Sequence, residues 1–542
     1  MGAALMIGFL AASAVYAGDD DVTKLKAQVA SQQAQIDQLR LALEEQKKMI
    51  GEILKPSTGF SLPRTNTLGE VASLSPVIGP PTPLPPAIKN VNLGQGGDVK
   101  PPMQIRLGDT YITPVGFMDL SYVSRTTNVG SGIGTNFGGI PFNNAVRGKL
   151  SESTLTAQNS RIGFRAESMV KGAHVTGYLE TDFLGNAPTN LFVTSNAATL
   201  RLRLYWVDVQ KDHWEVLAGQ TWSLLTPNRK GLSPLPGNIF FSQDIDTNYQ
   251  IGLTWTRAPE FRFVWHPNDH IAWAFAAENP QQYIGGSAGA GTVTLPPALS
   301  GGLANQLNDQ TTGTNVPNLH PDFMSKIAFD ATPSGHAVHF ELGGVIRSFK
   351  VGYLASALFP SDTTYTKTGG GVEFNSNIEL FKGFRIIENA YFSQGGGRYI
   401  FGQAPDLIIN RDGRPSLIRA ASTVDGLEWQ ATSKLVLYGY YGGMFVGKGI
   451  TVLDPVKGVY AGYGYPGGPG GQNRSIQEGT FGFQHTFWKD DNYGALSLYG
   501  QYSYLFRNPW AVQPGGVTEA HSNMIFANLR YTLPAGKVPS LK

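Results

Sequence analysis

Short segments in which apolar and polar residues alternate recur along most of this 542-residue chain. The segment Thr199–Gln210 reads TLRLRLYWVDVQ, and in an extended strand successive side chains lie on opposite faces. One face would carry Leu200, Leu202 and Leu204. The other would carry Arg201, Arg203 and Tyr205. In a soluble protein the leucines would meet a core, whereas in a membrane barrel they would meet lipid and the arginines would meet a water-filled lumen.

Further segments repeat this alternation over roughly ten residues, the length of a strand that crosses a membrane. They include Asn159–Ser168, Val338–Arg347, Leu496–Tyr504 and Ile525–Tyr531. In the first of them, Ile162 and Phe164 share one face, and Arg161 and Arg165 share the other. The repeated pattern predicts an all-β protein built from many short strands.

The connections between these segments alternate between long and short, and this alternation separates a membrane barrel from a soluble sandwich. Eight long connections and seven short turns predict sixteen antiparallel strands closed into a transmembrane barrel. The long connections are approximately Arg125–Gln158, Gly185–Ala198, Ser223–Asn248, Gln281–Asp322, Gly352–Lys367, Gly395–Thr423, Val446–Arg474 and Asn508–Glu519. This count requires Tyr249–Trp265 to be one long strand, with a bulge or a break at Pro259.

Composition agrees with a barrel and excludes several other classes. The chain has no cysteine, so disulfides, thiolate metal sites and a lipoprotein anchor are excluded. Its net charge of +2 gives no reason to expect nucleic acid as a partner. Beyond the N-terminus no apolar run reaches the roughly 18 residues of a transmembrane helix. Five tryptophans lie near expected strand ends, at the level of the lipid headgroups: Trp206, Trp214, Trp265, Trp429 and Trp488.

The first hundred residues differ from the rest. Residues 1–17 have the apolar run and small C-terminal residues of a signal peptide. Residues 22–55 form heptads typical of a coiled coil, with one amphipathic helix packed on the barrel as the alternative. The predicted coiled coil has two sets of seam positions, each with a spacing of seven residues. The first set is Val22, Val29, Ile36, Leu43 and Ile50, and the second, three residues further on, is Leu25, Gln32, Leu39, Gln46 and Ile53. Residues 56–103 are a Pro/Gly-rich linker, and residues 104–542 are the barrel.

This architecture, together with the segments NSRIGFRAE and AGQTWSLLTP, resembles the DcaP-like family of trimeric outer-membrane porins. The resemblance implies a homotrimer in the outer-membrane lipid, with the coiled coil in the periplasm. It implies passive diffusion of small anionic solutes, dicarboxylates in particular. A less specific general porin is one alternative. Another is a structural anchor, in which the coiled coil binds peptidoglycan and the barrel is merely inserted.

The connection between the fifth and sixth strands, which begins at Ser223, is expected to fold into the lumen. Within it, Asn228, Arg229 and Lys230 would narrow the pore with a positive tip, unless the connection is an ordinary exposed loop. Asp244 and Asp246 have the spacing that begins a calcium loop, but the required glycine and distant glutamate are absent, so no metal site is predicted. No cofactor is expected.

The proposed solute-binding residues are arginines on the inward face, because a guanidinium fork matches a carboxylate. With the two cations of the loop the set is Arg161, Arg165, Arg201, Arg203, Arg229, Lys230, Arg347 and Arg385, and Arg530 shares their parity. The alternative is that these arginines pair with wall carboxylates such as Glu167, Glu180, Asp182 and Glu341. No catalytic motif appears with suitable spacing, so an enzyme is not expected.

Overall fold

The computed structural model describes residues 103–534, apart from 186–197, 236–237, 241–243, 247–248, 287–288, 304, 308–315, 513–515 and 518–519. The predicted signal peptide, the coiled coil and all but the last residue of the linker lie outside the described residues. Within the described part of the chain, no helix is both long and apolar enough to cross a membrane.

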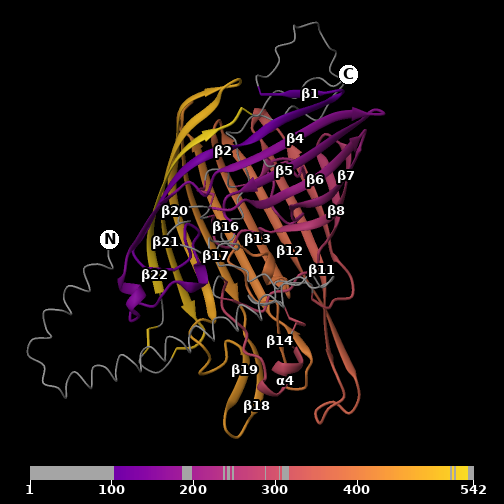
Figure 1. The fold of residues 1–542 in the computed structure, drawn as a ribbon, viewed down its shortest axis with the longest axis vertical. Helices are drawn as coiled ribbons and strands as arrows, with labels where there is room; N and C mark the ends of the chain where they lie inside the picture. The colour runs from indigo at the N-terminus through magenta and orange to yellow at the C-terminus, as the bar shows by residue number, and fades with distance from the viewer. Residues whose placement is uncertain are drawn as a thin grey trace, which may run out of the picture. The chain divides into compact units, whose positions relative to one another are not determined.

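Sixteen antiparallel strands form the wall of a closed barrel (Figure 1). In chain order they are β2 (Thr110–Arg125), β3 (Glu152–Thr156) continued by β4 (Arg161–Val170), β5 (Ala173–Asp182), β6 (Arg201–Lys211), β7 (Trp214–Trp222), β8 (Arg257–Asn268), β9 (Ile271–Glu278), β10 (Asp322–Ala331), β11 (Val338–Tyr353), β12 (Thr363–Phe381), β13 (Phe384–Gln394), β16 (Arg419–Gln430), β17 (Leu435–Val446), β20 (Asn473–Asp490), β21 (Gly494–Pro509) and β22 (Ala520–Thr532).

Closure of the wall depends on β2, which pairs with three other wall segments. Its C-terminal half pairs with β22 on one side and with β3 on the other. Its N-terminal half pairs with β4, so β3 and β4 share one position in the wall. A short strand, β1 (Ile105–Leu107), adds a hairpin to the start of β2. The predicted barrel of sixteen strands is confirmed.

Short turns lie at one end of the barrel and long connections at the other, as predicted. The long connections contain the hairpins β14 (Leu407–Ile409) with β15 (Pro415–Leu417) and β18 (Gly449–Asp454) with β19 (Val459–Tyr463). They also contain the short helices η1 (Phe137–Gly139), η2 (Val146–Lys149), α4 (Pro297–Ser300), η4 (Gly301–Leu303) and η6 (Gly397–Tyr399), whereas η5 (Pro333–Gly335) occupies a short turn. Strand β3 lies within a stretch that we expected to be a loop.

The predicted single strand Tyr249–Trp265 is wrong. Strand β8 begins only at Arg257, and Pro259 lies within it without any shift of register against β7. The irregularity falls instead near the turn, between Trp265 and Asn268, where the pairing with β9 shifts. Residues 249–256 leave the wall because their backbone N–H groups find acceptors in another connection, at Tyr399 and Phe401.

The two faces of the wall follow the predicted alternation. On the outward face, Ile162 and Leu202 are 42% and 48% exposed, as expected for lipid-facing side chains. On the inward face, Arg161 and Arg203 are no more than 1% exposed. The arginines of the segment Thr199–Gln210 therefore point inward.

Strand β6 contains one departure from that alternation. Its pairing with β5 shifts between Glu180 and Thr181, which inserts an extra residue into β6 at Arg203. Beyond this bulge the faces are exchanged, so that Leu204 is fully buried and Tyr205 is 41% exposed. The predicted orientations of these two residues are wrong for that reason.

Four of the five tryptophans face outward, close to the short turns. Trp214 stacks on Trp265, while Trp429 and Trp488 occupy the equivalent level on later strands. Trp206 differs, because it points inward and stacks on Tyr178 with the ring centres 5.3 Å apart. The prediction of a headgroup-level position is wrong for Trp206.

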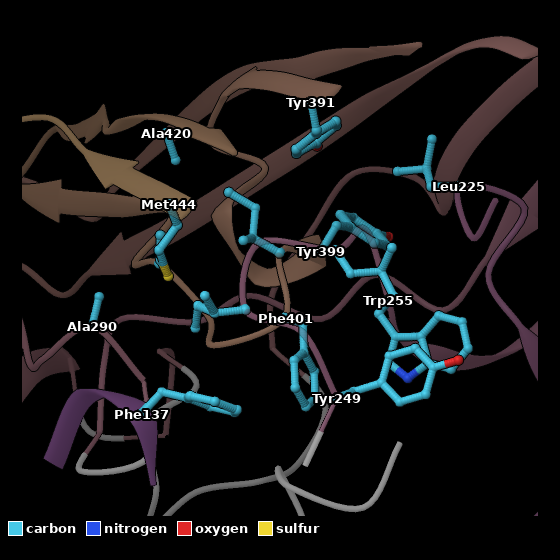
Figure 2. Packing of buried hydrophobic residues seen from close by; sticks show 14 of the residues in the cluster. Phe137, Leu225, Tyr249, Trp255, Ala290, Tyr391, Tyr399, Phe401, Ala420 and Met444 are labelled. Carbon is cyan, nitrogen blue, oxygen red and sulfur yellow. The ribbon is translucent and has the colours of Figure 1, made fainter. Parts of the chain in front are cut away.

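A large apolar cluster occupies part of the interior, where long connections pack against the wall (Figure 2). Trp255 and Tyr399 lie side by side in it, and Phe401 contacts Phe137 of η1 edge to face at 5.3 Å. Met444, on the inward face of β17, belongs to the same cluster. Part of the interior is therefore filled by connections that fold inward and bury their own apolar residues.

Candidate functional site

Residues 223–256, called the constriction loop below, join β7 to β8, and the described residues among them lie inside the barrel, as predicted. The loop is fixed to inward side chains around the circumference. Its N–H groups at Leu224, Asn228, Gly231, Ile245, Ile251 and Thr254 donate to Glu278, Glu341, Asp330, Gln501, Glu478 and Asn389, respectively. These acceptors belong to β9, β11, β10, β21, β20 and β13. A loop held from so many strands has a defined position in the pore.

Three of the proposed site residues meet at the short-turn mouth of the barrel, and we call Arg229, Lys230 and Arg385 the mouth group. Arg229 forms a bidentate pair with Glu428 of β16, with N–O distances of 2.9 and 3.1 Å. Arg385 is the second residue of β13 and lies within electrostatic reach of Arg229. Lys230 is exposed. Asn228 is buried and does not form part of an exposed tip.

The charge state of Arg229 is fixed by its surroundings. Burial alone would lower the pKa of the guanidinium, but the Glu428 carboxylate outweighs burial and raises the pKa above its ordinary value. Arg229 is therefore a permanent cation whose charge is countered by the Glu428 carboxylate.

The opposite end of the constriction loop carries two aspartates. Asp246 lies 4.0 Å from Arg161 and 2.5 Å from Arg530, so it acts as a counter-ion of wall arginines. Asp244 is 2% exposed, and burial together with the carboxylates of Glu478 and Glu428 raises its pKa well above its ordinary range. Within the described residues, no three His, Cys, Asp or Glu side chains are grouped to hold a metal ion.

Most of the wall arginines take part in one buried network of ion pairs, which we call the wall network. It contains Arg161, Arg201, Arg203 and Arg530, with Asp119, Glu180, Asp182 and Asp246. Arg203 is its centre, because the guanidinium lies 2.6 Å from Glu180 and 2.8 Å from Asp182. The carboxylates that we named as alternative partners thus include two of those actually used here.

The remaining two proposed residues lie apart from both groups. Arg165 pairs with Glu167 at 3.0 Å. Arg347 lies 2.8 Å from Asp322 and 3.0 Å from Asp406, which belongs to a long connection. Glu341 pairs with Lys326 and His339 rather than with an arginine. The eight residues therefore fall in four places, and solute binding at any of them stays a prediction.

The sequence reasoning missed several inward cations, including Lys326, Arg262 and, beside the wall network, Arg257. Arg257 was missed because the predicted strand Tyr249–Trp265 began too early. The face on which a residue lies cannot be deduced from an alternation that is counted across a loop. The available signal was Pro259, since the segment before a proline is a weak place to continue a regular strand.

No protein-family model matches the chain, and no curated protein matches its sequence. Among solved structures, the outer membrane channel DcaP of Acinetobacter baumannii aligns with a TM-score of 0.56 at 16% identity, over 78% of this chain and 97% of that one. The anion-selective porin from Comamonas acidovorans aligns with a TM-score of 0.43 at 13% identity, over 78% and 100%. The chain thus has the fold of the DcaP channel, which confirms at the level of the fold the resemblance drawn from its sequence.

Proposed function

We propose that this protein is an outer-membrane porin, through which small anionic solutes, dicarboxylates in particular, diffuse passively. The observation that supports this most is the constriction loop, held inside a closed barrel and bearing cations toward one mouth. A loop in that place narrows a pore and decides which solutes pass. Deleting the loop would not test the proposal, because it would not show which solutes the intact pore prefers. The test must therefore measure the sign of the charge that passes.

Anion preference is supported by the mouth group. It contributes three cations, of which Arg229 is ion-paired to Glu428 and Lys230 is exposed. A positive potential in a narrow, low-dielectric passage enriches anions and excludes cations, most strongly at low salt. Guanidinium groups also match the two oxygens of a carboxylate, which supports dicarboxylates as the solute class.

A homotrimer is supported by the outer surface of the wall. Glu388 on β13 and Asp425 on β16 are register partners, and they share the outward face with Ile386 and Leu427. Two neighbouring carboxylates against lipid would be unfavourable. A second copy of the chain covering this face would remove them from lipid.

A less specific general porin is the second candidate, and the wall network favours it. Arg161, Arg201 and Arg203 all lie beside carboxylates, so much of their charge is neutralised. The structural anchor to peptidoglycan depends on residues 22–55, outside the described residues, and no described contact favours it.

Single-channel recording in planar bilayers tests these proposals together. A salt gradient of potassium chloride gives the reversal potential, whose sign should indicate anion selectivity. Insertion should produce current steps in groups of three, as expected of a trimer. A cation-selective pore would contradict the proposed solute class, and a barrel without conductance would contradict the porin itself.

A further inference from the structure

Arg257 occupies a position that no role described above explains. It is the first residue of β8, directly after the constriction loop, and its register partner is Trp222 at the end of β7. The guanidinium carbon of Arg257 lies 5.7 Å from the centre of the Trp222 ring, and that of Arg203 lies 5.9 Å from it. One indole is thus contacted by two guanidinium groups.

The immediate surroundings of Arg257 contain hydrogen-bond donors without acceptors. Within the part of the chain that the structure describes, its own Nε and Nη1 are buried without a partner, and so are the Trp222 indole N–H and the Thr221 hydroxyl. The Trp255 indole N–H is in the same condition, and its ring lies 4.3 Å from that of Trp222. Buried donors are almost always satisfied in folded proteins, and a guanidinium or an indole N–H can only donate. The group that is missing here is an acceptor.

The charges around Arg257 are positive in excess. The wall network supplies four guanidinium groups against four carboxylates. Arg257 adds a further cation, and the nearest charges that act on it include those of Arg203 and Arg201. The charges of the wall network balance one another, because its carboxylates pair with other arginines. Adding Arg257 therefore leaves one positive charge in excess.

Carboxylates on β8 itself and on the adjoining β9 also have other partners. Glu260 lies 2.6 Å from Arg262. Glu278 accepts hydrogen bonds from the Ser223 hydroxyl and the Leu224 N–H of the constriction loop. Glu260 and Glu278 thus each have a described partner other than Arg257.

We propose that Arg257, with Trp222 and Thr221, is a binding site for a carboxylate group of a solute that passes the constriction loop. The guanidinium fork supplies two parallel donors and the charge, while the hydroxyl and the indole N–H supply neutral donors. Arg257 as a residue is partly exposed, although its Nε and Nη1 are buried. This inference rests on the proposed passage of anions and names the residue that holds them.

The test is the block of single-channel current by succinate in a chloride background, which gives an apparent dissociation constant. Arg257→Ala should weaken the block about tenfold, because a charge-assisted hydrogen bond is lost. Arg257→Lys keeps the charge but not the fork, and should weaken it about threefold. The control Arg474→Ala removes an exposed arginine at the start of β20 and should change nothing.

Heat-modifiable migration on gels shows whether each variant folds. If Arg257→Ala does not fold, Arg257→Lys and Trp222→Phe, which removes the indole N–H and keeps an aromatic ring, give the same comparison. Succinate block equal to that of the parent in the folded Arg257 variants overturns the inference. An anion-selective parent that succinate does not block also overturns it, whereas a cation-selective parent contradicts the proposed function itself.

Discussion

The wall network and the mouth group are both rich in arginine, but they meet very different surroundings. In the wall network every arginine lies within 4.0 Å of at least one carboxylate, and Arg203 is fully buried between two of them. In the mouth group Arg229 is paired, while Lys230 is exposed at the end of the pore. The comparison teaches that the position of a cation on the inward face does not decide its role. Its counter-ions do: paired arginines hold the wall together, and exposed cations set the potential that a solute meets.

The largest expected effect comes from breaking the wall network at its centre. Arg203→Ala would leave Glu180 and Asp182 buried with too little positive charge, which should cost about 3–5 kcal/mol of folding free energy. Urea titration of the barrel in lipid vesicles measures the change. The triple variant with Glu180→Gln and Asp182→Asn should recover much of the loss. An Arg203→Ala protein as stable as its parent would show that the network is not structural.

The neighbouring position tests the opposite face of the same strand. Leu202→Arg should cost about 2–4 kcal/mol if the residue lies near the membrane midplane, because the charge then faces hydrocarbon. The same urea titration measures it, and Val456→Arg on the exposed β18–β19 hairpin is the matched control. Equal stability of Leu202→Arg and its control would contradict the outward assignment of Leu202.

Removing Lys230 and Arg385, the two cations of the mouth group that form no ion pair within the described residues, should alter transport and leave stability nearly unchanged. The double variant Lys230→Ala with Arg385→Ala should lower the ratio of chloride to potassium permeability by roughly threefold, most clearly at low salt. Reversal potentials give the ratio directly, with Arg474→Ala as the control for loss of a distant charge. If the ratio is unchanged while Arg203→Ala changes it, the roles assigned to the two groups are reversed.

A smaller effect concerns Asp244 on the constriction loop. Its pKa is raised in the folded protein, so the folded state binds the proton more tightly, and stability falls as the pH rises from the ordinary range of an aspartate toward the raised pKa. Asp244→Asn cannot ionise and should escape this loss. Its unfolding midpoint should exceed that of the parent by about 2 °C at high pH, with the difference vanishing in acid. A difference that is the same at every pH would exclude ionisation as its cause.

The sequence alone predicted the number of wall strands, the end that carries the short turns, and the direction in which Ile162, Leu202 and Arg161 point. These features follow from local patterns, because alternation has a period of two residues and a lipid-facing wall permits only one orientation. The entry of the constriction loop into the lumen was expected from its place between the fifth and sixth strands.

Only the tertiary structure decided which charges meet. The faces on which Arg203 and Leu204 lie depend on a bulge. The bulge arises from the pairing between β5 and β6, and it cannot be recognised from the sequence of either segment alone. Asp246 reaches Arg161 and Arg530 because the loop crosses the barrel between strands that are distant in sequence. Arg257 became visible as an unpaired cation only when β8 was found to begin there. Alternation along one strand is local and can be read directly, whereas a counter-ion across the lumen is set by register and loop path, which depend on the whole closed wall.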